Sequence, residues 1–289
     1  MSIKYRILKI LHVICIVSLI TYSPQKSESV VKSGTNQDGI SFSGYQWNIK
    51  TSSNTLVGPG PNYFNDSIHH VWVDTYGFLH LRITHNIYED IWYCAEIFSV
   101  ESFGYGTYQF TLAPGFDLLD KNVVLGLFTY LDDFNEIDIE FAKWGNDENE
   151  NGQYVLQPSW KMNHKKRFNF ISNTEDSIHG FKWCKNSIRF WSLISENEVR
   201  WIYFGPGIPE PSTEHVNINL WLMQGLAPSN FLEAEVIIKS FEFIPFECLN
   251  CPIGFWWVAC FSIVGFVAII TIITIVFWDK KRRMKSKLL

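Results

Sequence analysis

Three carboxylates occupy alternate positions of the segment NEIDIEF, which covers residues 135–141. Alternate side chains of an extended strand lie on one face. We therefore expect Glu136, Asp138 and Glu140 to share a face, while the intervening Ile and Phe side chains enter the core. Like charges this close repel one another, which raises at least one carboxyl pKa, and carboxyls perturbed in this way tend to occur at functional sites.

Glycoside hydrolysis requires a pair of carboxyl groups, one acting as acid and the other as nucleophile or base, and a third carboxylate can tune their proton affinities. In a flat strand the Cα atoms of Glu136 and Glu140 lie about 13 Å apart, whereas a retaining enzyme holds its two carboxyls about 5–5.5 Å apart. Only a strongly curved strand reconciles these values, so the spacing leaves retention and inversion open. The alternative is that the charges protect an exposed sheet edge, although Lys is the usual residue for that purpose.

Short alternating segments, rather than helical periodicity, surround this motif. Residues 69–83 predict a hairpin that turns at Asp74–Gly77. Further strands are predicted at 106–114, 123–131, 136–144, 187–194, 199–204, 216–225 and 233–243. Many short strands separated by Gly, Pro and Asn are typical of an all-β sandwich or barrel.

The motif and its surroundings resemble glycoside hydrolase family 16. NEIDIEF matches the family signature E-x-D-x-E, and the chain is especially similar to the bacterial β-1,3-1,4-glucanases, or lichenases. The same likeness extends over about 60–243, and its clearest further segments are 92–114, 127–130, 181–191 and 217–221. The resemblance implies a concanavalin A-like fold, a curved antiparallel β-jelly-roll sandwich with a cleft across its concave sheet.

The resemblance also implies a role for each carboxylate. Glu136 would be the nucleophile, Glu140 the general acid/base, and Asp138 the residue between them, in a double displacement with retention of configuration. It further implies substrate-binding residues along the cleft, namely Glu96, Tyr130, Phe134, Asn219 and Trp221. As alternatives, Tyr130 and Trp221 are ordinary core aromatics and Asn219 is a structural hydrogen-bonding residue.

Several positions depart from the family pattern. Phe134 and Asn135 stand where lichenases have Trp-Asp, and Phe98 replaces an Arg that would contact sugar. The strand after the motif is changed at 154–160, and the partner cysteine of Cys94 is missing. The calcium-binding Asp of the family falls near Ile237, so we expect no cofactor and no metal ligand; a structural calcium ion is the alternative. With the catalytic residues intact and the binding residues altered, we expect an enzyme for a different glucan or another polysaccharide.

Both ends of the chain differ from an ordinary domain. Residues 1–23 combine a basic start with a short apolar run, which predicts a signal peptide; an uncleaved anchor is the alternative. Residues 253–278 contain no charge and are long enough to span a bilayer as a helix, with Trp at both ends. The predicted domain is therefore 24–246, followed by a juxtamembrane linker at 247–252 and, after the span, a basic cytoplasmic tail at 279–289.

These predictions imply a type I single-pass membrane protein whose domain is extracellular or lumenal. The net charge is −5 although basic residues cluster at both ends. The middle of the chain is therefore strongly acidic, which excludes nucleic acid as an expected partner. In an oxidising compartment the remaining cysteines are expected to pair, with Cys248 and Cys251 able to close a small disulfide, while the pairing of Cys94 and Cys184 stays open.

The sequence thus predicts a membrane-anchored, endo-acting glycosidase of β-glucan-like polysaccharides. Two alternatives remain. One is a cell-wall transglycosylase that passes the glycosyl group to another sugar, and the other is a non-catalytic carbohydrate-binding module on the same fold.

Overall fold

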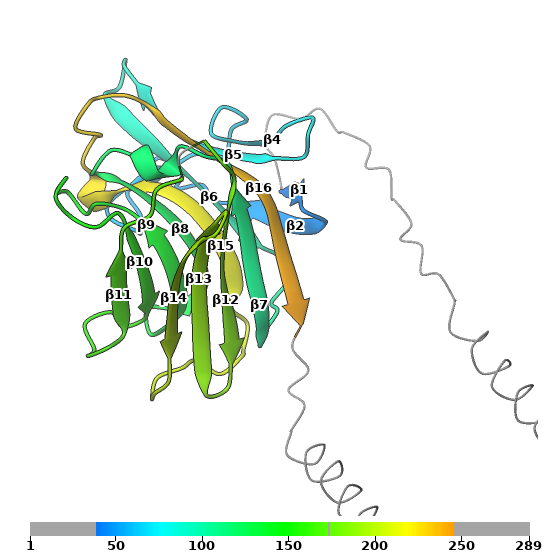
Figure 1. The fold of residues 1–289 in the computed structure, drawn as a ribbon. Helices are drawn as coiled ribbons and strands as arrows, with labels where there is room; N and C mark the ends of the chain where they lie inside the picture. The colour runs from blue at the N-terminus through cyan, green and yellow to red at the C-terminus, as the bar shows by residue number, and fades with distance from the viewer. Residues whose placement is uncertain (1–38, 173, 246–289) are drawn as a thin grey trace, which may run out of the picture. The chain divides into compact units, whose positions relative to one another are not determined.

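The computed structural model describes residues 39–172 and 174–245, which are built almost entirely of β-strands (Figure 1). The predicted signal peptide, linker, membrane span and tail lie outside these residues, as do Cys248 and Cys251. Within the part of the chain that is described, no helix is long and apolar enough to cross a membrane. The described residues all fall inside the predicted domain 24–246, whose boundaries remain a prediction.

Two sheets make up the fold, and almost all of their strand pairs are antiparallel. The first sheet contains, in spatial order, β11 (Lys165–Phe168), β10 (Gly152–Leu156), β9 (Asn135–Phe141), β8 (Val123–Asp132), β15 (His215–Leu222), β6 (Ile91–Ser99), β2 (Tyr45–Ile49) and β1 (Ile40–Phe42). The second contains β14 (Asn197–Tyr203), β13 (Ser187–Ile194), β12 (Ser177–Cys184), β7 (Gly106–Leu112), β16 (Ala234–Pro245), β5 (Leu79–Asn86) and β4 (Val71–Val73). The prediction of an all-β antiparallel fold is confirmed.

Short elements complete the fold. β5 pairs with the beginning of β6 and so connects the two sheets, and β3 (Tyr63–Phe64) lies parallel to β6. Two single turns of 3-10 helix, η1 (Phe116–Leu118) and η2 (Met223–Gly225), follow β7 and β15.

Aromatic side chains fill the space between the sheets. Phe141 of β9 meets His179 of β12 with ring centroids 4.8 Å apart, and Tyr154 of β10 stacks on Phe190 of β13 at 5.0 Å. Rings of this size remove a large apolar area from water, and they join strands of different sheets. The sandwich core therefore lies directly behind β9 and β10, the strands nearest the acidic motif.

Strand alternation predicted many of these elements. The hairpin at 69–83 is β4 and β5, and the Asp74 carboxylate accepts hydrogen bonds from the backbone N–H groups of Tyr76 and Phe78 in its turn. The strand predicted at 136–144 ends earlier, at Phe141, because Trp144 adopts a left-handed backbone conformation with φ of 51°. A chain in that conformation leaves the sheet.

Other strands carry no readable pattern. All five residues of β10 are buried, so its sequence does not alternate between apolar buried and polar exposed residues. β1 and β3 have three and two residues, which is too short to show a period. The pairing of these strands depends on tertiary contacts rather than on local sequence.

Candidate active site

The central strand of the candidate site is β9. Ile137, Ile139 and Phe141 are at most 1% exposed and belong to the core, so the three carboxylates between them point to the opposite face. We call this face, which carries Glu136, Asp138 and Glu140, the cleft face of the first sheet. It lies over β8, β9 and β10, which pair in antiparallel register from Glu136 to Phe141, while the register of β8 shifts between Tyr130 and Asp132.

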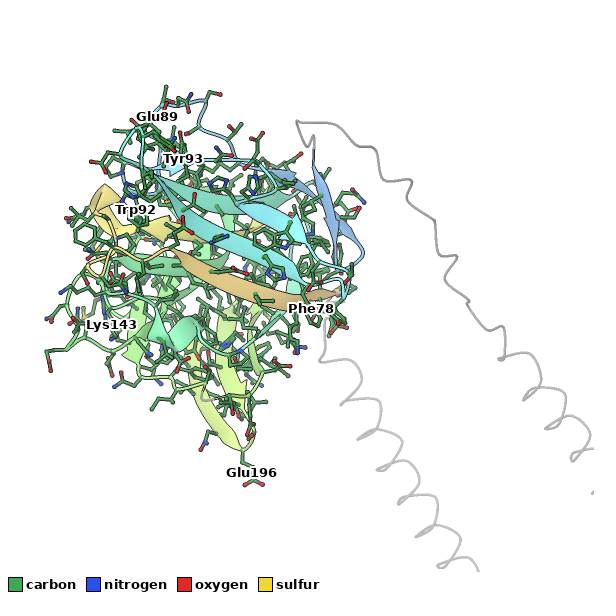
Figure 2. All side chains as sticks on the ribbon, turned by 90° about the horizontal axis from the view of Figure 1, so that it is seen from above. Phe78, Glu89, Trp92, Tyr93, Lys143 and Glu196 are labelled. Atoms are coloured by element: carbon green, nitrogen blue, oxygen red, sulfur yellow. The ribbon has the colours of Figure 1, made fainter. Side chains whose placement is uncertain are left out.

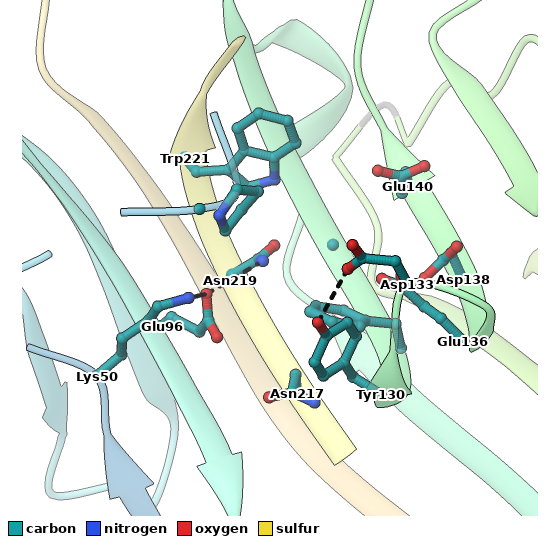
Figure 3. A pocket seen from close by; sticks show the side chains of 14 residues that line it. Lys50, Glu96, Tyr130, Asp133, Glu136, Asp138, Glu140, Asn217, Asn219 and Trp221 are labelled. Carbon is teal, nitrogen blue, oxygen red and sulfur yellow. Dashed lines mark hydrogen bonds and ion pairs between the residues drawn. The ribbon is translucent and has the colours of Figure 1, made fainter. Parts of the chain in front are cut away.

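A cavity of about 420 Å³ opens on the cleft face (Figure 3). Its walls come from four strands, the loop between β2 and β3, and the turn between β8 and β9. The lining residues are Lys50, Gly58, Pro59, Glu96, Gly126, Phe128, Tyr130, Asp133, Glu136, Asp138, Glu140, Asn217, Asn219 and Trp221.

Most of the residues that the sequence predicted as a site are together in this lining. The three carboxylates lie along one side of the cavity, and Glu96, Asn219 and Trp221 face them from β6 and β15 (Figure 3). Phe134 is the exception among the predicted residues. It lies in the turn between β8 and β9, is 64% exposed and does not line the cavity.

Glu96 lies opposite the carboxylates at the centre of a polar cluster. Its Oε2 is 2.9 Å from Nζ of Lys50 and accepts a hydrogen bond of 3.4 Å from Nδ2 of Asn219. Burial raises the pKa of the Glu96 carboxyl, and the Lys50 charge counteracts the rise. The buried carboxylate is therefore paired, as a charge removed from water must be.

The strand register explains why these groups meet. Asn219 lies directly opposite Glu96 on one neighbouring strand and opposite Gly126 on the other. A Cβ atom at position 126 would lie 2.5 Å from Oδ1 of Asn219. Only glycine therefore leaves room at position 126 for the Asn219 amide beneath the cavity.

The carboxylates of β9 are held by amides from β10 and from the loop after it. Gln153 Nε2 donates to Oε2 of Glu140 at 2.6 Å, and Gln157 Nε2 donates to Oδ2 of Asp138 at 3.2 Å. These bonds fix two of the three carboxyl groups. A side-chain amide does not titrate, so it can donate a hydrogen bond to either the protonated or the ionised form of the acid.

All three carboxyls have a raised pKa, and the main cause is burial. For Asp138 the charges of Glu136 and Glu140 add to the effect of burial. Glu136 is raised to about 8, although a hydrogen bond from Asp138 acts in the other direction. Two carboxyls that share a hydrogen bond hold a proton between them, so Asp138 donates while Glu136 accepts.

The two predicted aromatic residues differ. Tyr130 is 37% exposed and lies at the cavity wall rather than in the core. Its Oη donates to Oδ1 of Asp133 at 3.0 Å. Burial and the Asp133 carboxylate raise the pKa of Tyr130 to about 12. Trp221 is 9% exposed and belongs to the hydrophobic core, yet one side of it lines the cavity.

Two acceptors on the cleft face are buried without a hydrogen-bond partner in the described residues, Oδ1 of Asn219 and Oε1 of Gln153. Buried polar atoms are nearly always satisfied by protein or by water. These two oxygens can therefore accept hydrogen bonds from a ligand that carries hydroxyl or N–H donors.

Sequence reasoning missed several residues of the site. Lys50 and Asp133 line the cavity and Gln153 holds Glu140, but none belongs to the acidic motif or to a segment with a clear period. Among these three residues only Asp133 had a local signal, because it lies two residues before Asn135, where the acidic segment begins. Lys50 comes from a loop after β2 and reaches the site only through the pairing of β2 with β6.

Cys94 lies under the cleft face as a thiol rather than in a disulfide. Its Sγ donates to Oδ1 of Asn62 at 3.5 Å, and complete burial raises the thiol pKa to about 12. Ile237, where the family has a calcium-binding Asp, lies in β16 of the second sheet. Within residues 39–172 and 174–245, no group of three or more His, Cys, Asp or Glu side chains could hold a metal ion.

Comparisons with known proteins agree on the fold. No protein-family model matches the chain. No curated protein matches it either. Solved structures do match. A β-glucanase of Bacillus licheniformis superposes with a TM-score of 0.55 at 19% identity, covering 74% of this chain and 95% of that one.

Two further structures are similar to the same degree. A prokaryotic β-1,3-1,4-glucanase (lichenase) from a mouse hindgut metagenome has a TM-score of 0.53 at 22% identity, covering 69% of this chain and 93% of its own. An immunostimulatory antigen and pseudo β-1,3-glucanase of Mycobacterium tuberculosis has a TM-score of 0.54 at 17% sequence identity, covering 70% of this chain and 91% of its own. The chain therefore has the jelly-roll fold of these glucanases, and at such identities the likeness concerns the fold alone.

Proposed function

We propose that the chain is a retaining, endo-acting glycosidase that cleaves O-glycosidic bonds of β-glucan-like polysaccharides. The observation that carries this proposal is the row of Glu136, Asp138 and Glu140 along one strand, lining a cavity of about 420 Å³. The fold shared with solved β-glucanases supports it. A module that only bound sugar would have no use for three buried carboxyls whose mutual repulsion costs free energy.

The proposed reaction is a double displacement. Glu140, protonated, gives its proton to the oxygen of the leaving sugar while the ionised Glu136 attacks the anomeric carbon. Asp138 donates a hydrogen bond to Glu136 and so favours the ionised form of the nucleophile. The resulting glycosyl-enzyme is then hydrolysed by water, which gives its proton to Glu140. Two inversions leave the configuration of the anomeric carbon unchanged.

Opposite these groups, the cluster of Lys50, Glu96 and Asn219 is suited to bind sugar hydroxyls. Glu96 accepts hydrogen bonds, Lys50 donates them, and Asn219 has an unpaired Oδ1. Trp221 offers an aromatic surface to the apolar C–H face of a sugar ring. These contacts would hold the glycone side of the polymer across from the carboxylates.

The activity is tested with the full-length protein, a panel of neutral β-glucans, and Glu136→Gln as the inactive comparison. We expect only the original protein to release reducing ends. We also expect NMR to show that the first product keeps the β-configuration. Inversion at the anomeric carbon would contradict the proposed mechanism. Products longer than the substrate when acceptor sugars are added would identify a transglycosylase instead.

The proposal includes the place of the enzyme in the cell. The uncharged segment 253–278 and the basic tail after it support a type I membrane anchor, with the catalytic domain on the outer or lumenal side. We expect the protein to remain in the membrane fraction after alkaline carbonate extraction, and a variant that ends at residue 252 to be released. Release of both proteins would contradict the anchor.

A non-catalytic binding module is the second candidate. The observation in its favour is the similarity to a solved structure described as a pseudo β-1,3-glucanase. It predicts binding of glucan without product release, unchanged in Glu140→Gln. Hydrolysis by the original protein excludes it.

A further inference from the structure

Strand β11 forms the edge of the first sheet and extends the cleft face beyond Glu140. Gln153 of β10 lies directly opposite Glu140 on one side and opposite Arg167 of β11 on the other. Val155 likewise lies opposite Lys165. Directly opposed residues of neighbouring antiparallel strands point to the same face, so Lys165 and Arg167 both belong to the cleft face.

The residue between them confirms this orientation. Lys166 points to the other side of the strand, where its Nζ donates to the backbone oxygen of Arg200 at 2.6 Å. Arg200 lies in β14, which belongs to the second sheet. The run of basic residues at 165–167 is therefore divided, with two cations on the cleft face and one on the opposite face.

The two cations on the cleft face make no close ion pair, although both lower the pKa of Glu140. Neither Lys165 nor Arg167 forms an ion pair with any residue that the structure describes, whereas Lys50 and Lys239 each do. Trp144 lies beside the guanidinium, with 5.8 Å between Cζ and the ring centroid, and Nη1 of Arg167 is buried without a hydrogen-bond partner. Lys165 is exposed and Arg167 is half-buried, so the observation that indicates a ligand is the buried Nη1 atom of Arg167. A buried donor left without an acceptor costs free energy, and a bound oxyanion would supply that acceptor.

The position of these cations relative to Glu140 indicates which part of a ligand they meet. A general acid protonates the oxygen of the leaving sugar, so that sugar must lie beside Glu140. From there the cleft face continues through Gln153 to Arg167 and Lys165. Both charges act on Glu140, where they oppose the rise in its pKa that burial causes.

We propose that Lys165 and Arg167 form a subsite for an anionic substituent, a carboxylate or a sulfate ester, on the leaving-group side of the polysaccharide. This inference rests on the proposed function and names the substrate class of the same site. Arg binds planar oxyanions through two parallel hydrogen bonds, and Lys adds a compact charge. The cavity itself, whose lining includes neither cation, contains several carboxylates that repel an anion. The enzyme therefore selects a polymer whose acidic group falls at this one position.

The test measures affinity rather than turnover. Oligosaccharides of one length are prepared from a neutral β-glucan, from the same glucan with its primary alcohols oxidised to carboxylates, and from a sulfated form. The full-length protein is expected to bind one anionic form about tenfold more tightly than the parent, with the preference falling as salt is raised. The form that binds more tightly identifies the substituent.

Variants of β11 locate the effect. Lys165→Gln with Arg167→Gln should abolish the preference and leave the affinity for the neutral parent unchanged within about twofold, the scatter allowed for independent sites. Lys166→Gln removes the same type of charge from the opposite face and should keep the preference. Lys165→Arg with Arg167→Lys should also keep it, which separates loss of charge from loss of folding.

Equal affinity for the neutral and anionic forms would overturn the inference. So would a loss of the anionic preference in Lys166→Gln as large as in the double variant of Lys165 and Arg167. A changed pH profile on the neutral glucan without any binding preference would mean that the two cations act only on Glu140, and this also overturns the subsite. Hydrolysis of the neutral glucan with no anionic preference retains the proposed function alone. Binding of the anionic form through β11 without hydrolysis of any glucan retains the subsite and removes the proposed function.

Discussion

Nε2 of Gln153 lies 2.6 Å from Oε2 of Glu140, and the two residues are direct partners in the pairing of β9 with β10. The proposed acid is thus oriented by a neutral amide on the next strand. Residues in a regular ladder have little freedom to move apart, so this bond positions the carboxyl group for proton transfer.

Replacing Gln153 by Ala should change the pH dependence of the enzyme. The amide lowers the pKa of Glu140, so its removal raises that pKa and moves the alkaline limb of the kcat/KM profile to higher pH. We expect kcat/KM at the optimum to fall about tenfold, because the carboxylate that forms as Glu140 gives up its proton loses a hydrogen bond. Gln46→Ala, on the exposed bond to Ser41, is the control. An alkaline limb that moves down or stays in place contradicts the assignment of Glu140.

The two proposed catalytic residues should respond differently to the leaving group. Glu136→Ala and Glu140→Ala should each lower kcat/KM on a polymeric glucan about 1,000-fold. A dinitrophenyl glycoside needs no proton for departure, so Glu140→Ala should form the glycosyl-enzyme with it at nearly the original rate. Glu136→Ala should not, because it lacks the nucleophile. The rapid release of dinitrophenol is the measurement, and rapid release by Glu136→Ala alone would reverse the two roles.

The buried carboxyl groups should make the protein less stable at high pH. A carboxyl whose folded-state pKa lies above its unfolded value contributes stability below the unfolded pKa, and this is lost as the pH rises through the folded pKa. Glu136 is raised from 4.5 to about 8. Glu136→Gln should therefore match the original protein at pH 4 and exceed its free energy of unfolding at pH 9 by on the order of 5 kcal/mol.

Urea denaturation at the two pH values checks this prediction. Glu196→Gln, at the tip of the β13–β14 turn (Figure 2), makes the same chemical change on the surface and should have no effect at either pH. A gain at pH 4 as large as the gain at pH 9 would show that the variant acts through packing rather than through ionisation.

Removal of the Lys50 ammonium should destabilise the fold. Glu96 is 6% exposed, so Lys50→Met leaves a nearly buried carboxylate without its ion pair. We expect a loss of about 2 kcal/mol at pH 7.5, less than for a completely buried pair because Lys50 is partly exposed. The loss should shrink at pH 5, where Glu96 takes up a proton more readily. Thermal denaturation measures both values, and adding Glu96→Gln should restore most of the stability.

The thiol of Cys94 should be inert in the folded protein. Its side chain is fully buried, and burial raises the thiol pKa to about 12, so hardly any reactive thiolate forms at pH 8. Iodoacetamide at pH 8 should modify Cys94 only after unfolding in urea, as read by mass spectrometry of the peptide. Rapid modification under native conditions would mean that the segment below the cleft opens easily.

The local part of this protein can be read from its sequence. The period of two in NEIDIEF requires that Glu136, Asp138 and Glu140 share a face and that Ile137 and Ile139 lie in the core, because the backbone of a strand turns side chains alternately to its two sides. The hairpin at 69–83 follows from the same period and from a turn residue, Asp74, that bonds its own backbone. Both features depend on residues that are neighbours in sequence.

What faces the three carboxylates was decided by the tertiary structure. Lys50, Glu96 and Asn219 meet because β2, β6 and β15 pair in one particular register, and a shift of one residue would turn each of these side chains to the other face. β10 and β11 give no local signal, yet their pairing places Gln153 and Arg167 beside Glu140. A register between distant strands is fixed by packing over the whole core. The sequence alone therefore predicted the carboxylates of the proposed reaction but not the residues that surround them.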